Sequence, residues 1–395
     1  MSKVFVTGMG VISPIGTTVA ENRVALKEGR SGLSSIELFS TKYAGLLPFG
    51  EIKITNEILE EKLNAKTPGI TRTTLLALDA FDQAMNDSQL SPDELRLFDT
   101  ALIIGNTVGG MCVTDELYRD ANQNQVGSSY LSSYDLGSIA IYIQRRYGIN
   151  GVVNTINTAC SSSANAIMYG ARLIKNGFAK RAIVGGVDSL AKFTINGFNS
   201  LNILSSSPCR PFDAERSGLN LGEGAAFLVI EGEEEVKSKK VYAEVSGYAN
   251  TNDAFHPSSL SDNGEGPYLA MKQALEVAKL APEQIGFIHA HGTGTENNDE
   301  AESKAFLRLF NSPPPFASVK SNIGHTLGAA GAFGALYGIM NLEFQEIYPS
   351  LNFKEPIVST GLSPVKEYKQ MKIEHVMANS FGFGGNCSSL VFSKV

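Results

Sequence analysis

One cysteine stands where a strand-like segment gives way to small residues, in the stretch NTINTACSSSANAIMYG of residues 154–170. The β-branched residues before Cys160 predict a strand, and the Ser- and Ala-rich residues after it predict a helix. A cysteine in the first turn of a helix meets free backbone N–H groups and the positive end of the helix dipole, which favour the thiolate. Small neighbours permit a sharp turn and leave room for a substrate. Cys160 is therefore a candidate nucleophile, although a lone cysteine between small residues is also typical of a packed core thiol.

Two of the five histidines lie in glycine-rich polar loops. His291 opens HGTGTENNDEAE, and His325 lies in KSNIGHTLGAAG, five residues after Lys320. Either loop alone is also typical of a solvated segment or a structural histidine. His289 and His291 would share one face of a strand and could bind a metal. No carboxylate or cysteine stands at a recognised spacing from them, so we expect no metal site.

A weak internal repeat indicates how these distant motifs could meet. Four strand-like segments recur in the same order: 3–13 with 241–251, 98–110 with 284–295, 152–174 with 316–340, and 180–189 with 372–385. Strands and helices alternate, so we expect an α/β protein of two similar halves, 1–240 and 241–395, each a mostly parallel sheet covered by helices. Packing about a pseudo-twofold axis would bring the segments at Cys160 and His325 face to face, with the loop after His291 nearby.

Composition narrows the class of protein. The 395 residues are 43% hydrophobic and 18% charged, with a net charge of -7 and scattered Lys and Arg, which argues against nucleic acid or an anionic membrane as the main partner. Four cysteines without a CxxC pair indicate a reducing compartment and no structural zinc. The apolar N-terminal run is short and broken by Gly8, Gly10 and Pro14, so it predicts a strand and turn rather than a signal peptide. No apolar stretch approaches the roughly 20 residues of a membrane span, and we expect a cytoplasmic protein.

As an ordered set, TACSSS, HGTGTENND, KSNIGHTLGAAG and the terminal NSFGFGGN resemble the β-ketoacyl-[acyl-carrier-protein] synthases, condensing enzymes of the thiolase superfamily. The similarity runs from VFVTGMGVISPIG to the last strand and includes RPFDAERSGLNLGEGAAFLVIE at residues 210–231. It implies a thiolase-like fold with layered αβαβα architecture. It also implies a decarboxylative Claisen condensation of malonyl-carrier protein with an acyl group held on Cys160, in fatty-acid or polyketide/polyene biosynthesis, with no bound cofactor.

The resemblance assigns the central roles. Cys160 is expected to carry the acyl thioester, while His291 and His325 donate hydrogen bonds to the enolate oxygen that forms during decarboxylation. Elementary chemistry agrees, because neutral donors stabilise a developing enolate whereas a carboxylate would oppose it. A nearby cation such as Lys320 can help to hold a thiolate.

Further residues enter by the same resemblance. Lys320 corresponds to the family lysine that is linked to an acidic partner, here Glu302, with Asp299 in the same network. Thr293 and Thr295 resemble the hydroxyls that hold the pantetheine arm.

The glycine-rich loop near the C-terminus supplies the last expected site residue. The backbone N–H groups of Cys160 and Phe383 resemble an oxyanion hole. Phe383 also resembles the family's gate to the acyl pocket, and Gly382, Gly384 and Gly385 would let it move.

The sequence departs from the family pattern in several places. Ser163 stands where a glycine is common, and Asn386-Cys387 replaces the usual Thr-Asn. The motif HGTGT in place of HGTST favours polyketide or polyene assembly. Segment 121–133 lacks the basic residues that commonly dock the acidic carrier protein, for which the substitutes would be Lys62, Lys66 and Arg72.

Two other classes stay open. A thiolase shares the fold, but it needs a second catalytic cysteine leading a C-terminal glycine loop, whereas Cys387 follows its loop. A non-catalytic chain-length partner usually lacks the nucleophile, so Cys160 argues against it. We expect an acyl-carrier protein and malonyl-carrier protein as partners, and a homodimer or a heterodimer with a chain-length factor.

Overall fold

The computed structural model describes residues 3–236 and 239–395. The strands of the main sheet are β1 (Val4–Ile12), β4 (Thr100–Gly105), β5 (Val153–Ile156), β6 (Arg181–Asp188), β7 (Gly224–Gly232), β8 (Ala243–Asn252), β9 (Phe287–His289), β10 (Phe316–Ala317), β13 (His375–Phe381) and β14 (Asn386–Ser393). Two small sheets pair β2 (Leu33–Ser34) with β3 (Phe49–Gly50) and β11 (Glu346–Ile347) with β12 (Lys369–Gln370).

The helices are α1 (Val19–Lys27), α2 (Asn56–Leu63), α3 (Arg72–Ser88), α4 (Pro92–Leu95), α5 (Thr114–Gln123), α6 (Ser138–Tyr147), α7 (Ser162–Lys175), α8 (Lys192–Ser200), α9 (Glu265–Ala278), α10 (Glu296–Leu309), α11 (Lys320–Ile323) and α12 (Ala330–Phe344). Short 3-10 turns are η1 (Gly109–Val113), η2 (Leu131–Ser133), η3 (Glu233–Glu235), η4 (Pro282–Gln284) and η5 (Leu327–Ala329). No helix in the described ranges is both long enough and apolar enough to cross a bilayer.

The order of strands repeats along the main sheet, which reads β10-β9-β13-β14-β8-β1-β7-β6-β4-β5. From either outer edge inward, the order is the third, second, fourth, fifth and first strand of that half. In each half only the fifth strand, β7 or β14, runs antiparallel to its neighbours. The two halves join where β1 pairs antiparallel with β8. The expectation of two pseudo-repeated α/β halves is confirmed, while their boundary at residue 240 stays a prediction.

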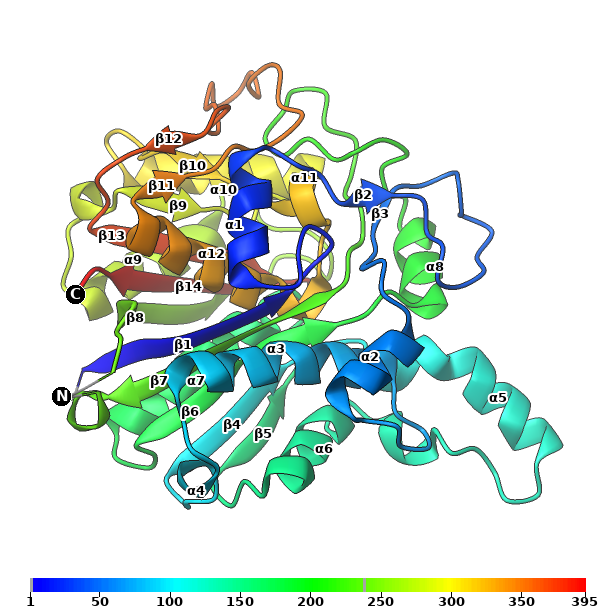
Figure 1. Cartoon of the computed structure of the whole chain (residues 1–395). Helices are drawn as coiled ribbons and strands as arrows, with labels where there is room; N and C mark the ends of the chain where they lie inside the picture. The colour runs from blue at the N-terminus through cyan, green and yellow to red at the C-terminus, as the bar shows by residue number, and fades with distance from the viewer. Residues whose placement is uncertain (1–2, 237–238) are drawn as a thin grey trace.

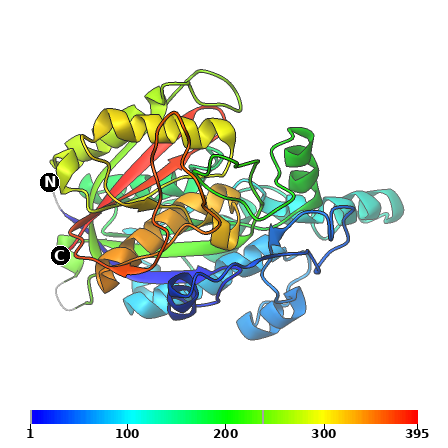
Figure 2. The same ribbon diagram turned by 90° about the horizontal axis from the view of Figure 1, so that it is seen from above.

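Five layers follow from strands that are apolar on both faces. In β6, Ala182 and Val184 pack in the central core, whereas Ile183 and Val187 pack in the cluster that includes α3 and α6. Figure 2 shows α9 and α10 outside one part of the sheet, the orange α12 in the middle, and α3 on the far side. Helices α7 and α12 contact each other between the two halves of the sheet, which gives the predicted αβαβα architecture (Figure 1).

Helix α12 is buried on nearly every side, as expected for a helix in the middle layer. Its Ala and Gly residues let it approach α7 closely. A Cβ atom at Gly331 would lie 2.6 Å from the backbone nitrogen of Ala164. This close approach places the segment that precedes α12 against the segment that precedes α7, so His325 can reach Cys160.

Candidate active site

Cys160 lies at a sharp turn between β5 and α7. Ala159 has a left-handed backbone with φ +54°, which few residues with a Cβ atom adopt. The Ser162 hydroxyl holds this turn by accepting from the Thr158 N–H at 2.9 Å and donating to the Ala159 carbonyl at 2.6 Å. The helix begins only at Ser162, so Cys160 precedes it instead of lying in its first turn.

The resting state of Cys160 differs from the sequence-based expectation. The side chain is buried, and this burial raises the pKa of the thiol to about 11, against the opposing effects of the Lys320 charge and the Phe383 N–H group. The helix end and Lys320 were expected to favour the thiolate, whereas the net shift of the pKa is upward. Desolvation outweighs the charge of Lys320 and the backbone N–H groups of Phe383 and Cys160 because the sulfur is removed from water.

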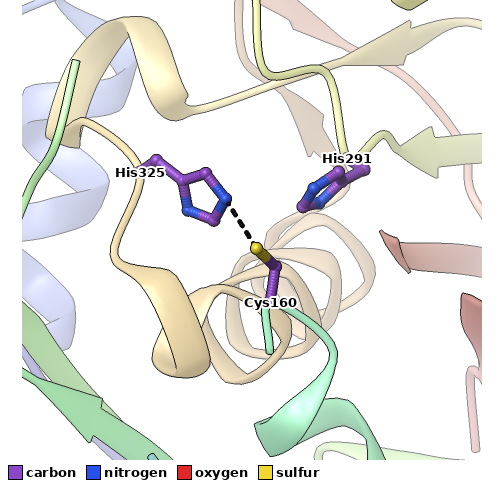
Figure 3. Close-up of side chains that lie close together, drawn as sticks. All are labelled: Cys160, His291 and His325. Carbon is purple, nitrogen blue, oxygen red and sulfur yellow. Dashed lines mark hydrogen bonds between the residues drawn. The ribbon is translucent and has the colours of Figure 1, made fainter. Parts of the chain in front are cut away.

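His325 lies directly against the nucleophile. Its Nε2 atom is 3.1 Å from the Cys160 Sγ atom (Figure 3). On the other side of the ring, the Leu327 N–H donates to Nδ1 at 3.1 Å. Because Nδ1 accepts, the ring proton is on Nε2, and Nε2–H points to the sulfur.

His291 enters the site from the end of β9. The Lys320 ammonium is 3.3 Å from the His291 Nδ1 atom and also donates to the His291 carbonyl oxygen. An ammonium can only donate, so Nδ1 accepts and the proton of this ring is also on Nε2. The centroids of the His291 and His325 rings are 5.4 Å apart, and Figure 3 shows both rings converging on Cys160.

Both imidazoles are neutral. Burial and the Lys320 charge lower the pKa values of His291 and His325 well below 6.5. The site therefore presents two neutral N–H donors beside a thiol.

Two buried carboxylates hold the loop of His291. Glu302 accepts from the backbone N–H groups of His291 and Gly292, each at 2.9 Å. Asp299 accepts from the N–H of Gly294 at 3.1 Å, farther along the same loop. The backbone of His291 is thus held by two side chains: Lys320 donates to its carbonyl oxygen, and Glu302 accepts from its N–H group. Burial lowers the pKa of Lys320 and raises that of Glu302, while the charge of each partner opposes the shift of the other.

Cys160, His291 and His325 line a cavity of about 450 Å³. Its walls include Cys160, Phe198, Leu201, Ile203, Leu219, Leu260, His291, Thr293, Thr295, His325, Phe381 and Phe383. The Thr293 and Thr295 hydroxyls lie 2.8 Å apart in this wall. The cavity brings the predicted nucleophile, both histidines, both threonines and Phe383 together.

Phe383 lies at the cavity wall with 36% of its surface exposed. Its ring stacks on Phe198 of α8, with centroids 5.9 Å apart and an interplanar angle of 17°. The next two residues, Gly384 and Gly385, have φ values of +83° and +81°, which favour glycine. Sequence reasoning missed Phe198, because a lone aromatic residue in a short helix carries no motif.

Two residues that depart from the family pattern, Ser163 and Asn386, make hydrogen bonds to other segments near the site. Ser163 accepts from the Ala332 N–H at 2.8 Å and so links α7 to α12. The Asn386 side-chain oxygen accepts from the Ser161 hydroxyl at 2.7 Å, which ties the Phe383 loop to the residue after the nucleophile. Cys387 is buried in a small apolar cluster with Phe381, and burial raises the pKa of its thiol.

One candidate for carrier docking is contradicted. Arg72 is buried and makes a forked contact with Glu223 at 2.6 to 3.1 Å, so it has no free charge for a partner protein. Lys62 pairs with Asp79 at 2.5 Å, and Lys66 is exposed. The two lysines stay predictions.

The donor atoms of Cys160, His291 and His325 lie within 4.8 Å of one another, a spacing that a metal ion could bridge. The tautomers oppose this use, because both Nε2 atoms carry protons and the Lys320 ammonium would repel a second cation. His289 lies apart from the three donors. Its ring nitrogens have no hydrogen-bond partner within the described part of the chain, and burial lowers its pKa to about 3.

Two joined α/β halves, with a cysteine at a strand-to-helix turn of one and histidines from the other, define a condensing enzyme of thiolase-like fold. Residues 1–236 match the family model "Beta-ketoacyl synthase, N-terminal domain", and residues 242–354 match "Beta-ketoacyl synthase, C-terminal domain". The chain belongs to the β-ketoacyl synthase family, whose members are acyltransferases.

Similar proteins agree with this family. The putative mitochondrial 3-oxoacyl-[acyl-carrier-protein] synthase of Schizosaccharomyces pombe is 33% identical, over 100% of this chain and 99% of the relative. The solved ishigamide ketosynthase/chain length factor is 31% identical with a TM-score of 0.93, covering 100% of this chain and 99% of that one. A chain from the solved complex of a type II polyketide synthase acyl-carrier protein with its ketosynthase bound to the hexaketide is 27% identical with a TM-score of 0.87, covering 100% of this chain and 99% of that one.

Proposed function

We propose that this chain is a 3-oxoacyl-[acyl-carrier-protein] synthase that joins malonyl-carrier protein to an acyl group held on Cys160. The observation that carries the proposal is the pair of neutral imidazoles whose Nε2–H groups face the Cys160 sulfur, one of them at 3.1 Å.

The first step loads the acyl group. The Cys160 sulfur attacks the thioester carbonyl of the acyl-carrier protein, the bond from that carbonyl to the carrier sulfur breaks, and the thiol proton passes to the departing sulfur. The backbone N–H groups of Cys160 and Phe383 stabilise the negative charge on the thioester oxygen. Lys320 lowers the free energy of the transient thiolate through its charge.

The second step forms the new carbon–carbon bond. The malonyl group loses carbon dioxide, and the electron pair of the broken bond becomes an enolate whose oxygen accepts hydrogen bonds from His291 and His325. The enolate carbon then attacks the Cys160 thioester, and the carbon–sulfur bond breaks. The Cys160 thiolate takes up a proton from solvent, and the 3-oxoacyl chain leaves on the carrier. Lys320 maintains the donating tautomer of His291 throughout.

Partners follow from the same chemistry. Thr293 and Thr295 line the cavity where the pantetheine arm would enter, and the solved ketosynthase complex with an acyl-carrier protein supports a carrier as partner. We propose a dimer. A heterodimer with a chain-length factor is the second candidate, favoured by the similarity to the ishigamide ketosynthase/chain length factor. A cytoplasmic location stays a prediction.

Intact-mass spectrometry tests the loading step. The wild-type protein is incubated with carrier proteins bearing saturated, unsaturated or aryl acyl groups, and malonyl-carrier protein is then added while carbon dioxide is measured. We expect one acyl mass on the wild type and on the control Cys112→Ala, and none on Cys160→Ala. A folded wild type that gains no acyl mass from any carrier contradicts the proposal for this chain alone.

A further inference from the structure

A buried carboxylate that no motif singled out lies at the end of β6. Asp188 is fully buried and accepts four backbone or hydroxyl donors. The Thr107 N–H donates at 2.9 Å, the Thr107 hydroxyl at 2.7 Å, the Val108 N–H at 2.7 Å and the Gly328 N–H at 2.7 Å. One side chain thus fastens the loop after β4 to the turn that follows His325.

Leu327 and His325 connect the Gly328 contact to Cys160. Leu327, the residue before Gly328, has φ +50°, a left-handed backbone that is strained for a residue with a branched side chain. The N–H of Leu327 donates to His325 Nδ1, and this contact assigns the ring proton to Nε2. His325 Nε2–H in turn faces Cys160.

We propose that Asp188 is a positioning residue for His325. By accepting from the Gly328 N–H, the carboxylate holds Leu327 in its left-handed conformation, and this conformation aims the Leu327 N–H at His325 Nδ1. Asp188 touches neither the sulfur nor a substrate in the proposed chemistry. It acts by fixing which nitrogen of His325 donates.

The tautomer of His325 decides whether its Nε2 atom can stabilise the enolate. If the Leu327 N–H turned away, Nδ1 could carry the proton and Nε2 would present a lone pair to the enolate oxygen, which would repel it. The energetic effect of a wrong tautomer is large in other catalytic sites. The kinetic part of this inference rests on the proposed function, whereas the tautomer itself does not.

Histidine NMR tests the tautomer directly, because the chain has only five histidines. The protein is labelled with ¹⁵N-histidine, and His325→Gln assigns the His325 signals. We expect the wild type to show Nε2–H alone, and Asp188→Asn to show a mixture of tautomers, since its amide group would face N–H donors. Thr107→Val removes one bond to the same carboxylate but leaves Gly328 in place, so its His325 signals should match those of the wild type.

Kinetics test the consequence. We expect Asp188→Asn to lower kcat for malonyl decarboxylation by about 10- to 100-fold, as for a misplaced catalytic group, with a smaller change in KM. Glycine adopts positive φ without strain, so Leu327→Gly should make the Asp188 contact less important. In a double-mutant cycle, we expect Asp188→Asn to lower kcat by less than about threefold when it is added to Leu327→Gly.

A further variant covers the case in which Asp188→Asn does not fold. A Cβ atom at Gly328 would lie 2.8 Å from Asp188 Oδ2 and 3.0 Å from both Asn106 Cα and Thr107 Cγ2, so Gly328→Ala should separate the Gly328 N–H from the carboxylate without replacing Asp188. An unchanged His325 tautomer in the folded Asp188 or Gly328 variant overturns the inference. The inference is also overturned if Asp188→Asn lowers kcat equally in the wild type and in Leu327→Gly. A wild type that has the expected tautomer but is inactive would instead count against the proposed function only.

Discussion

The pH dependence of Cys160 alkylation is the most direct test of the electrostatics of the site. Burial raises the pKa of this thiol to about 11 from an ordinary value of 9.0. Only the thiolate reacts, so at pH 8 the reactive fraction is about 0.001 in place of about 0.1, a deficit of about 100-fold. The rate should therefore rise about tenfold for each pH unit and should not level off until close to pH 11.

Lys320→Met tests how much the charge of Lys320 contributes to the pKa of Cys160. The Lys320 charge lowers the pKa of Cys160, so its removal should slow alkylation at neutral pH. Burial also lowers the pKa of Lys320 itself, so the lysine loses its charge at high pH and the two profiles should converge there.

The assay follows iodoacetamide adducts on Cys160 by peptide mass spectrometry, with circular dichroism at each pH to verify the fold. Cys160→Ala identifies signal from the other cysteines. A plateau of the wild-type rate below pH 9 would refute the reasoning, because it would mean that the site stabilises the thiolate more than burial destabilises it. Faster alkylation of Lys320→Met at neutral pH would refute it too.

Two further predictions concern stability. Arg72→Met should lower the free energy of unfolding in urea by about 3 to 5 kcal/mol, because it leaves the buried Glu223 charge unpaired, and a loss below 1 kcal/mol would contradict a tight pair. His289 has a folded pKa of about 3 and an ordinary value of 6.5, so below pH 6.5 the unfolded chain binds a proton that the folded protein excludes, and stability falls as pH falls toward 3. On going from pH 7.5 to 5.5, His289→Leu should lose about 1.4 kcal/mol less unfolding free energy than the wild type, and an identical loss would show that folding leaves the pKa of His289 unchanged.

Residue types and their order predicted the central site because its chemistry needs particular side chains at strand ends. Cys160 and His325 occupy equivalent positions of the two repeats, so the repeat, together with packing about a pseudo-twofold axis, predicted that they would meet. The repeated strand order shows why: the third strand and the following helix take the same place in each half.

Burial and long-range pairing were beyond sequence reasoning. The thiolate expectation failed because the sulfur is shielded from water by segments far away in the chain. Arg72 looked like a surface charge because its partner Glu223 is 151 residues away. The contacts of Leu327 were equally hidden, since nothing in its side chain indicates a left-handed backbone.

The strand order also has a consequence for folding. Strands β13 and β14 follow the other strands of the main sheet in the sequence, yet they occupy the interior of the second half of the sheet, between β9 and β8. The sheet of that half therefore cannot close until both strands have docked between β9 and β8, so its assembly depends on contacts between segments that are distant in the sequence. A chain that terminates just before Phe383 keeps β13 but lacks β14 and the gate residue, so both β8 and β13 lose their β14 neighbour.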